Sequence, residues 1–436
     1  MKKRIFSLLL AAGFLCGCST TWAPGEAEKP WNAVPTEERI EYDWMAGESP
    51  VPNRRVGLNR GWFMGDTVQT VSDRGIYFIY RPDWQLDVTP PSPWILYMDH
   101  GSDTVIKLCG RPDCTHDTTD CNAFLDSAQA LHFYNGYLYV ISSGPIRTED
   151  NQGDAEIYWV TKLHRMDPDG TNRVELFNFT DYAREKGGDF AQCSFLGDCC
   201  LMNILNYESD PDTAVTTESG DCYLYKLDGS MAEPQEDDIP LSPLYNCGDI
   251  LLALDEDSDT KTYWELDMET RETHYLMDYP GVAAFCYEQQ GIYFKDGCLH
   301  RVTYATGTDE VVLETKLTGN YLPLCFPDCI VLADRDFTRG SPDPNLYIYN
   351  WAFESVGTVT LDYPYDDVTA SLIMAENPRQ IVLSGGTSPE LPTYYIDKAE
   401  LGRENLQLHR LQMPDLEDAQ QLWQEIQEDR AWFAEN

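Results

Sequence analysis

Long apolar runs are missing from this chain of 436 residues. Its most apolar stretch, Ile5 to Leu15, is shorter than the run of about 18 residues that a membrane-spanning helix needs. Positive charge is also scarce, since 31 Lys and Arg stand against 73 Asp and Glu and the formal net charge is −42. Because such a chain repels a polyanion and offers no basic stripe, nucleic acid is excluded as a partner.

Recognisable catalytic signatures are missing as well. The sequence holds no Gly-x-Ser-x-Gly elbow, His-Glu-x-x-His pair, Walker loop or Rossmann glycine fingerprint. The seven histidines are scattered, and carboxylates are too abundant for a catalytic pair to be selected by position. Helical periodicity is nearly absent, which argues against a helical bundle. We therefore assign no catalytic residues.

The N-terminal residues form a recognisable targeting pattern. Met1-Lys2-Lys3-Arg4 is basic, an apolar run follows, and small residues precede a cysteine, which predicts a secretory signal peptide over residues 1–17. Leu15-Cys16-Gly17-Cys18 resembles the lipobox of bacterial lipoproteins. That resemblance implies that Cys18 becomes the first mature residue and carries a lipid. We accordingly expect an extracytoplasmic protein, lipid-anchored to the bacterial cell membrane through Cys18.

The remaining chain divides into three predicted parts. Residues 18–45 are rich in Thr, Pro and Glu and lack apolar periodicity, as expected of a flexible tether. Residues 46–410 are predicted to form the folded body. In residues 411–436, Leu422, Ile426 and Phe433 recur at near-helical spacing and predict one C-terminal helix that packs on the body.

The folded body repeats a short pattern, in which turn residues precede an alternating or apolar run. Each copy is followed by two more strand-like runs around a polar turn, the clearest lying between Lys162 and Phe177. β-branched and aromatic residues at alternating positions, bounded by Gly, Asp, Asn and Pro, predict antiparallel strands. The seven copies are 74–78, 135–139, 197–201, 247–251, 290–294, 327–331 and 378–382.

This repetition predicts an all-β fold, a β-propeller of seven four-stranded blades. A radial array buries both faces of each small sheet against its neighbours and leaves few exposed edges. A β-solenoid would need shorter, more regular repeats, and two β-sandwiches would not produce seven similar hairpins. Leu163 to Asn172, with its turn Asp167-Pro168-Asp169-Gly170, resembles the strand-turn signature of TolB-type and related WD40-like propellers. The resemblance covers one blade and implies a propeller.

The densest group of potential metal ligands lies between Cys109 and Cys121. Cys114 and His116 are two residues apart, so an extended backbone would point both side chains to one side. Cys109 and Cys121 can fold back to join them around Pro112. Three thiolates and one imidazole satisfy tetrahedral zinc without an open position, which predicts a structural metal site. A disulfide between two of the cysteines and reduced packing thiols are the alternatives.

The same segment carries a second resemblance. Cys109-Gly110-Arg111-Pro112-Asp113-Cys114-Thr115-His116, followed by Cys121, resembles uncharacterised surface lipoproteins of anaerobic Gram-positive bacteria with propellers. Beyond this cluster and the signal region, most cysteines fall on expected strands, where small thiols fill a core. We would test Cys286 with Cys298, and Cys325 with Cys329, first as disulfide pairs.

Two classes of function follow from this reading. The favoured one is a non-enzymatic module that binds an envelope protein, a peptide or a carbohydrate. The other is a propeller enzyme, a glycan hydrolase or lyase whose carboxylates converge at the central mouth. No cofactor is required by either, apart from the structural zinc proposed for Cys109, Cys114, His116 and Cys121.

Overall fold

A computed structural model of the chain shows two units, Met1–Pro35 and Thr36–Asn436. No helix among the described residues is long and apolar enough to cross a bilayer. The signal peptide and Cys18 lie outside the described residues, as does nearly all of the expected C-terminal helix. The structure describes residues 40–51, 69–80, 92–118, 120–149, 155–188, 190–209, 216–227, 235–236, 242–246, 250–255, 261–267, 272–282, 284–287, 289–334, 343–361, 373–385, 388–404 and 406–416.

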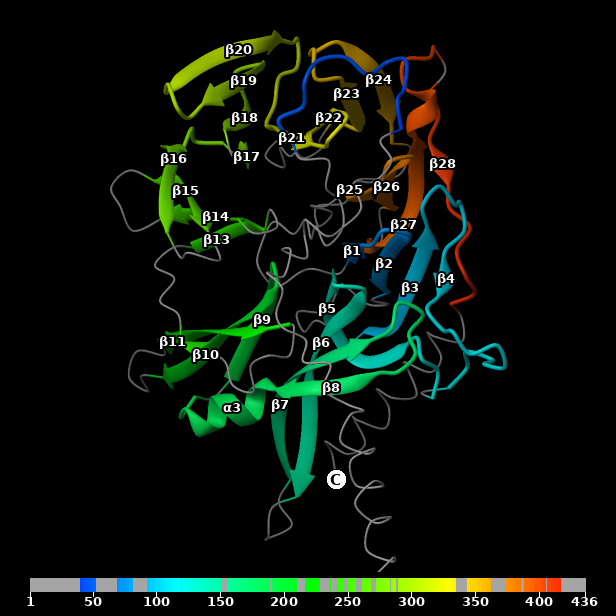
Figure 1. Ribbon diagram of the computed structural model, residues 1–436, viewed down its shortest axis with the longest axis vertical. Coiled ribbons are helices and arrows are strands. Elements are labelled where there is room, and N and C mark those ends of the chain that lie inside the picture. Colours follow the sequence, from blue (N-terminus) through cyan, green and yellow to red (C-terminus); the bar gives the residue numbers. More distant parts are fainter. Residues whose placement is uncertain are drawn as a thin grey trace, which may run out of the picture. The chain divides into compact units, whose positions relative to one another are not determined.

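The first sheet has eight strands, paired antiparallel in the order β1-β2-β3-β5-β6-β7-β8, with β4 paired to β3 (Figure 1). It contains two consecutive groups of four strands, which join where Trp94 of β3 pairs with Phe124 of β5. The strands are β1 (Gln69–Val71), β2 (Gly75–Tyr80), β3 (Ser92–Asp99), β4 (Ile106–Lys107), β5 (Phe124–Tyr134), β6 (Tyr137–Glu149), β7 (Ala155–Met166) and β8 (Val174–Asn178).

Five four-stranded antiparallel sheets follow, each built from consecutive strands and therefore from one colour range in Figure 1. The first comprises β9 (Phe190–Leu196), β10 (Cys199–Ser209), β11 (Thr216–Lys226) and β12 (Gln235–Glu236), and the second β13 (Ser242–Asn246), β14 (Ile250–Asp255), β15 (Thr262–Asp267) and β16 (Thr273–Asp278). The third comprises β17 (Ala284–Tyr287), β18 (Gln290–Lys295), β19 (Cys298–Thr303) and β20 (Thr308–Glu314). The fourth comprises β21 (Tyr321–Cys325), β22 (Ile330–Asp334), β23 (Asn345–Tyr349) and β24 (Ser355–Thr360), and the fifth β25 (Ile373–Glu376), β26 (Gln380–Gly385), β27 (Ser388–Asp397) and β28 (His409–Arg410).

The repeats found in the sequence coincide with every fourth strand. All seven copies overlap the second strand of a four-strand group, namely β2, β6, β10, β14, β18, β22 and β26. The all-β fold with antiparallel sheets is thereby confirmed. The number of blades stays a prediction, because the first eight strands form one hydrogen-bonded sheet.

Alternation along β22 shows how neighbouring sheets share a core. Val331 and Ala333 pack in a cluster with Ile381 and Leu383 of the β25–β28 sheet. Ile330 and Leu332, which point to the other face, pack in a second cluster with strands of the β17–β20 sheet. All five residues of β22 are buried. Each face of this strand is therefore covered by a different neighbouring sheet.

The first and last sheets of the chain also contact each other. The backbone N–H of Gly101 donates to Gln380 Oε1 at 3.1 Å, and Gln380 Nε2 donates to the Ser102 carbonyl at 2.8 Å. Thr104 forms an isolated parallel bridge with Gln412. Consecutive small sheets that pack face to face, with the last against the first, form a β-propeller.

The segment just before the sheets packs on the folded body. Trp44 is buried in the cluster that β22 and β26 share, and its Nε1 donates to the Lys398 carbonyl at 2.8 Å. The Ala352 N–H donates to the Ala46 carbonyl at 2.9 Å. Trp44 lies at the C-terminal end of the 18–45 segment assigned to a tether, whose residues up to 39 lie outside the described residues.

A short helix that the sequence analysis missed follows β8. It is α3, Phe179–Glu185, and Asn178 caps it by accepting a hydrogen bond from the Asp181 N–H. The available signal was the Asn cap with an acidic residue in the first turn. Because the apolar residues span only two turns, helical periodicity is too brief to detect there.

Lys398 is fully buried beside two buried carboxylates. Its Nζ lies 2.9 Å from Asp328 Oδ2 and also hydrogen-bonds Glu376 Oε1. Asp328 precedes β22, Glu376 ends β25 and Lys398 follows β27, so the group links the last two sheets. A buried ion pair stabilises a fold only as long as all partners are present, because a lone buried charge is costly.

Replacing Lys398 by Met therefore leaves Asp328 and Glu376 buried without a counter-charge. We expect Lys398→Met to lower the free energy of unfolding by about 3–5 kcal/mol, measured by urea denaturation. The control Lys295→Met removes an exposed lysine and should have little effect. Equal stability of the two variants would contradict a structural role for the buried ion cluster.

His132 of β5 reaches toward the next sheet. Its Nε2–H donates to the Gly197 carbonyl at 2.8 Å, and its ring stacks on Phe195 at 5.2 Å between centroids. Burial lowers the pKa of His132 to about 4, against a hydrogen bond to Gly197 that raises it. The folded protein thus holds this imidazole neutral.

The unfolded chain takes up this proton near pH 6.5, whereas the folded protein resists it down to about pH 4. Stability is therefore retained above pH 6.5 and falls as the pH drops from 6.5 to 4, by up to about 3 kcal/mol from this residue. His132→Gln should flatten the pH dependence of the unfolding free energy in that window, whereas replacing exposed His274 should not. A slope unchanged in His132→Gln would refute this assignment.

Candidate metal centre

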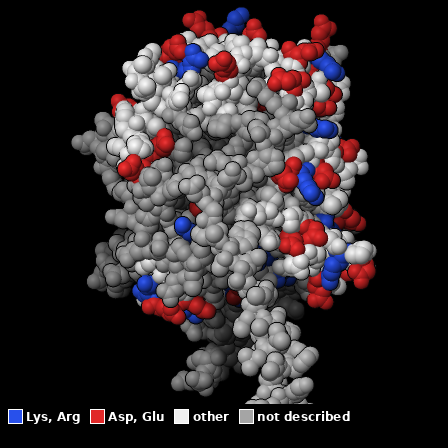
Figure 2. All heavy atoms as spheres, viewed as in Figure 1, with Lys and Arg blue, Asp and Glu red and all other residues white. Residues whose placement is uncertain are grey.

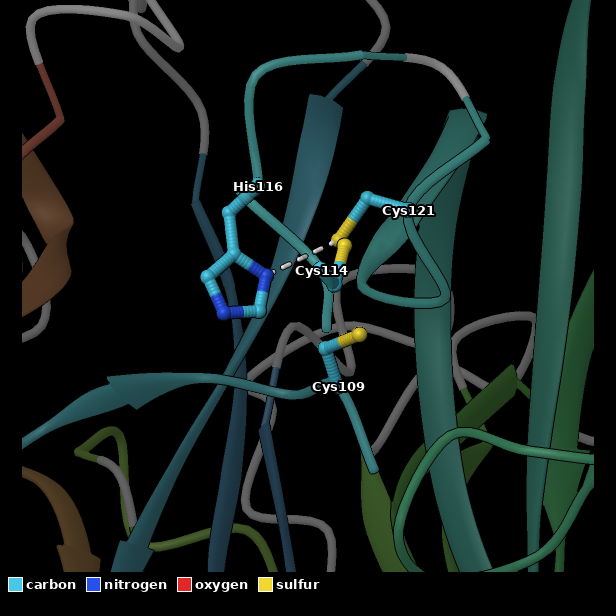
Figure 3. A group of neighbouring side chains, drawn as sticks. All are labelled: Cys109, Cys114, His116 and Cys121. Atoms are coloured by element: carbon cyan, nitrogen blue, oxygen red, sulfur yellow. Dashed lines mark hydrogen bonds between the residues drawn. The ribbon is translucent and has the colours of Figure 1, made fainter. Parts of the chain in front are cut away.

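Three cysteines and one histidine meet in the loop between β4 and β5. One ligand atom from each lies within 4.8 Å of the ligand atoms of all the others. Figure 3 shows the imidazole and the sulfur atoms converging, with His116 Nδ1 lying 3.3 Å from Cys121 Sγ. The structure thus brings together the four residues that the sequence singled out, which are Cys109, Cys114, His116 and Cys121.

Two turns fold the loop around this cluster. The Cys114 N–H donates to the Arg111 carbonyl at 3.3 Å, and the Cys121 N–H donates to the Thr118 carbonyl at 3.1 Å. The expectation that an extended backbone would align Cys114 and His116 is wrong, because His116 has a φ of 63°. This left-handed conformation, uncommon outside glycine, turns the imidazole toward the thiols.

The loop rests on the turn that resembles the TolB-type signature. The Gly110 N–H donates to the Asp169 carbonyl at 2.7 Å. A Cβ at Gly110 would lie 2.6 Å from Asp169 Oδ2, and one at Gly170, whose φ is 81°, would lie 2.9 Å from the Leu108 carbonyl oxygen. Both glycines therefore permit a close approach of the two segments. Two motifs separated in sequence form one local structure.

The surroundings shift the pKa values of Cys109, Cys121 and His116 differently. Burial raises the pKa of the Cys109 thiol, but hydrogen bonds from the backbone of Arg111 and Asn122 outweigh it and lower that pKa to about 7. Burial raises the pKa of the Cys121 thiol to about 12. Burial, together with the positive charges of Lys107 and Arg111, lowers the pKa of His116 and favours the neutral imidazole that binds metals.

The donor set fits a tetrahedral zinc ion. With Zn–S bonds of about 2.3 Å, the sulfur atoms of a tetrahedral site lie roughly 3.8 Å apart, so the observed cluster needs only a modest contraction. Thiolates and imidazole are ligands that zinc accepts, and four protein ligands leave no position for substrate. The cysteines of this cluster are free thiols in the structure. The arrangement suits a structural metal.

Other tryptophans and cysteines have structural roles. Trp94 and Trp351 are buried in the core, and Trp264 is half-buried against Tyr275. Cys298, Cys325 and Cys329 are free thiols, so the structure forms no disulfide from Cys325 and Cys329. The side chain of Cys286 lies outside the described residues.

The fold and the cluster define an all-β propeller with a Cys3His group. No protein-family model and no curated protein matches the chain. Similar solved structures include an acylaminoacyl peptidase in complex with Z-Gly-Gly-Phe-chloromethyl ketone, 12% identical with a TM-score of 0.39, covering 66% of this chain and 44% of that one. TolB from Acinetobacter baumannii is 10% identical with a TM-score of 0.28 and coverages of 57% and 61%. The β-propeller domain of the Trilobed protease from Pyrococcus furiosus is 10% identical with a TM-score of 0.31 and coverages of 66% and 98%.

This chain thus spans less than two thirds of the length of the first two structures. The likeness is distant, and the propeller fold follows from the sheets of this chain.

Metal binding can be tested on the reduced protein. We expect one Zn²⁺ or Co²⁺ per chain, with affinity falling as the pH is lowered because the ligands must lose protons. Cys121→Ser should weaken uptake and abolish the rise in unfolding temperature on adding zinc, whereas Cys298→Ser, outside the cluster, should not. Absence of metal uptake by the reduced parent chain would refute the site.

Proposed function

We propose that the chain is an extracytoplasmic lipoprotein, anchored through Cys18, whose propeller acts as a ligand- or protein-binding module. The anchor is supported by the lipobox-like segment, and the Cys3His cluster supports a structural zinc that shapes one loop. A closed set of four ligands has no vacant position for a substrate, so it serves stability.

The contacts of the buried carboxylates favour a binding role over glycan hydrolysis. Among the described residues these are Asp328, Asp334 and Glu376. Lys398 engages Asp328 and Glu376, and Asp334 Oδ2 accepts a hydrogen bond from the Asp343 N–H at 2.7 Å. A glycosidase needs two carboxyl groups that face a substrate. Asp328 and Glu376 instead join the last two sheets through Lys398, and Asp334 makes a contact within the β21–β24 sheet.

The negative net charge of the chain limits the kinds of partner that it can bind. On the face of the molecule drawn in Figure 2, acidic side chains are spread over the described surface, with fewer basic ones among them. Since the chain carries a net charge of −42, it repels nucleic acid and anionic lipid headgroups. The acyl chain on Cys18 then provides the attachment to the membrane. An envelope protein, a peptide or a neutral carbohydrate is the compatible ligand.

Affinity purification of the full chain from detergent-solubilised membranes tests this function. We expect a specific envelope partner with the parent chain, and mass spectrometry should find a lipid on Cys18. Cys18→Ala should leave the chain unlipidated and outside the membrane fraction, while the purified variant still binds the isolated partner. Recovery of no partner, together with turnover of a screened glycan, would contradict the binding role.

A further inference from the structure

Positive charges gather at the thiol cluster, although the chain has few of them. Lys107 Nζ lies 3.5 Å from the His116 carbonyl oxygen, and Arg111 Nη2 lies 3.2 Å from Cys114 Sγ. Arg173 Nη1 donates to the carbonyl of Phe124, three residues after Cys121, at 2.5 Å. Only 31 of the 436 residues are Lys or Arg, and three of them lie around this one small loop, which itself carries Asp113, Asp117 and Asp120.

Arg111 makes the most direct contacts of the three. Its Nη2 donates to Cys114 Sγ and also to the Asp120 carbonyl at 2.5 Å. Its own carbonyl accepts the Cys114 N–H in the turn described above, and its backbone N–H is hydrogen-bonded to the Cys109 thiol. One residue thus contacts two of the three sulfur ligands and spans the loop from Cys109 to Asp120.

The net charge of a zinc ion with these four ligands indicates the role of the Arg111 guanidinium. Three thiolates, a neutral imidazole and one divalent cation carry a net charge of −1. In a chain that is already strongly acidic, a residual negative charge at a half-buried site is unfavourable. A guanidinium at hydrogen-bonding distance from a thiolate balances that charge and orients the sulfur atom, as residues around the ligands do in other metal sites.

We propose that Arg111 is a positioning residue of the metal centre, which neutralises the excess charge of the zinc-bound thiolates and fixes Cys114 through a hydrogen bond. The inference rests on the proposed structural zinc. A guanidinium suits this role because its Nη2 carries two N–H donors, which reach Cys114 Sγ and the Asp120 carbonyl together. Lysine would keep the positive charge without the planar guanidinium.

The test is the affinity of the full, reduced chain for Zn²⁺ alone, measured by competition with a chelator, with Co²⁺ spectra as a second readout. We expect Arg111→Gln to weaken zinc binding by about 10- to 100-fold, the usual effect of removing a residue that supports metal ligands. Arg111→Lys should fall between this variant and the parent. Arg301→Gln, which removes an arginine paired with Glu310 in another sheet, is the matched control and should bind as the parent does.

The Co²⁺ spectrum separates a weakened site from a lost one. A tetrahedral thiolate spectrum at saturating Co²⁺ in Arg111→Gln, at reduced affinity, supports the positioning role. Unchanged zinc affinity in both Arg111 variants would overturn it while leaving the metal site intact. A parent chain that binds no metal would overturn the metal site, and the role of Arg111 with it.

Discussion

The fold depends on burying both faces of each small sheet against neighbouring sheets. A single four-stranded sheet from this chain would expose two apolar faces, because its alternating residues are apolar on both sides. β22 shows this most clearly, since all five of its residues are buried and its two faces belong to different clusters. No sheet is therefore stable alone, and contact between the first and last sheets leaves fewer unsatisfied faces.

The thiol cluster follows one of the shortest strands, β4. β4 has only two residues, so few backbone hydrogen bonds hold the chain before it leaves the sheet. The loop that follows is fastened by the Gly110 contact to Asp169 and by convergence of the four ligands. A metal would cross-link this loop where strands cannot, because small structural zinc sites replace missing core. A bound metal and sheet packing would thus act on the same junction.

Strand positions could be predicted from the sequence because alternation is local, as the repeats at Ile330-Val331 and Ile381-Val382 show. The membership of the cluster could also be predicted, since Cys109 and Cys121 lie only 12 positions apart. The left-handed backbone of His116 could not, because a turn and its surroundings set that angle. The group formed by Asp328, Glu376 and Lys398 was equally hidden, since only tertiary packing joins residues so far apart in sequence.

Distribution of charge connects the structure with the proposed role. The buried carboxylates form contacts between and within sheets, whereas the many exposed carboxylates keep the surface acidic. In the proposed lipoprotein, an acidic body would stay clear of anionic membrane lipids and would leave its loops accessible to other molecules. Arg111, which donates to Cys114 Sγ, is the cation that meets the thiol cluster most directly.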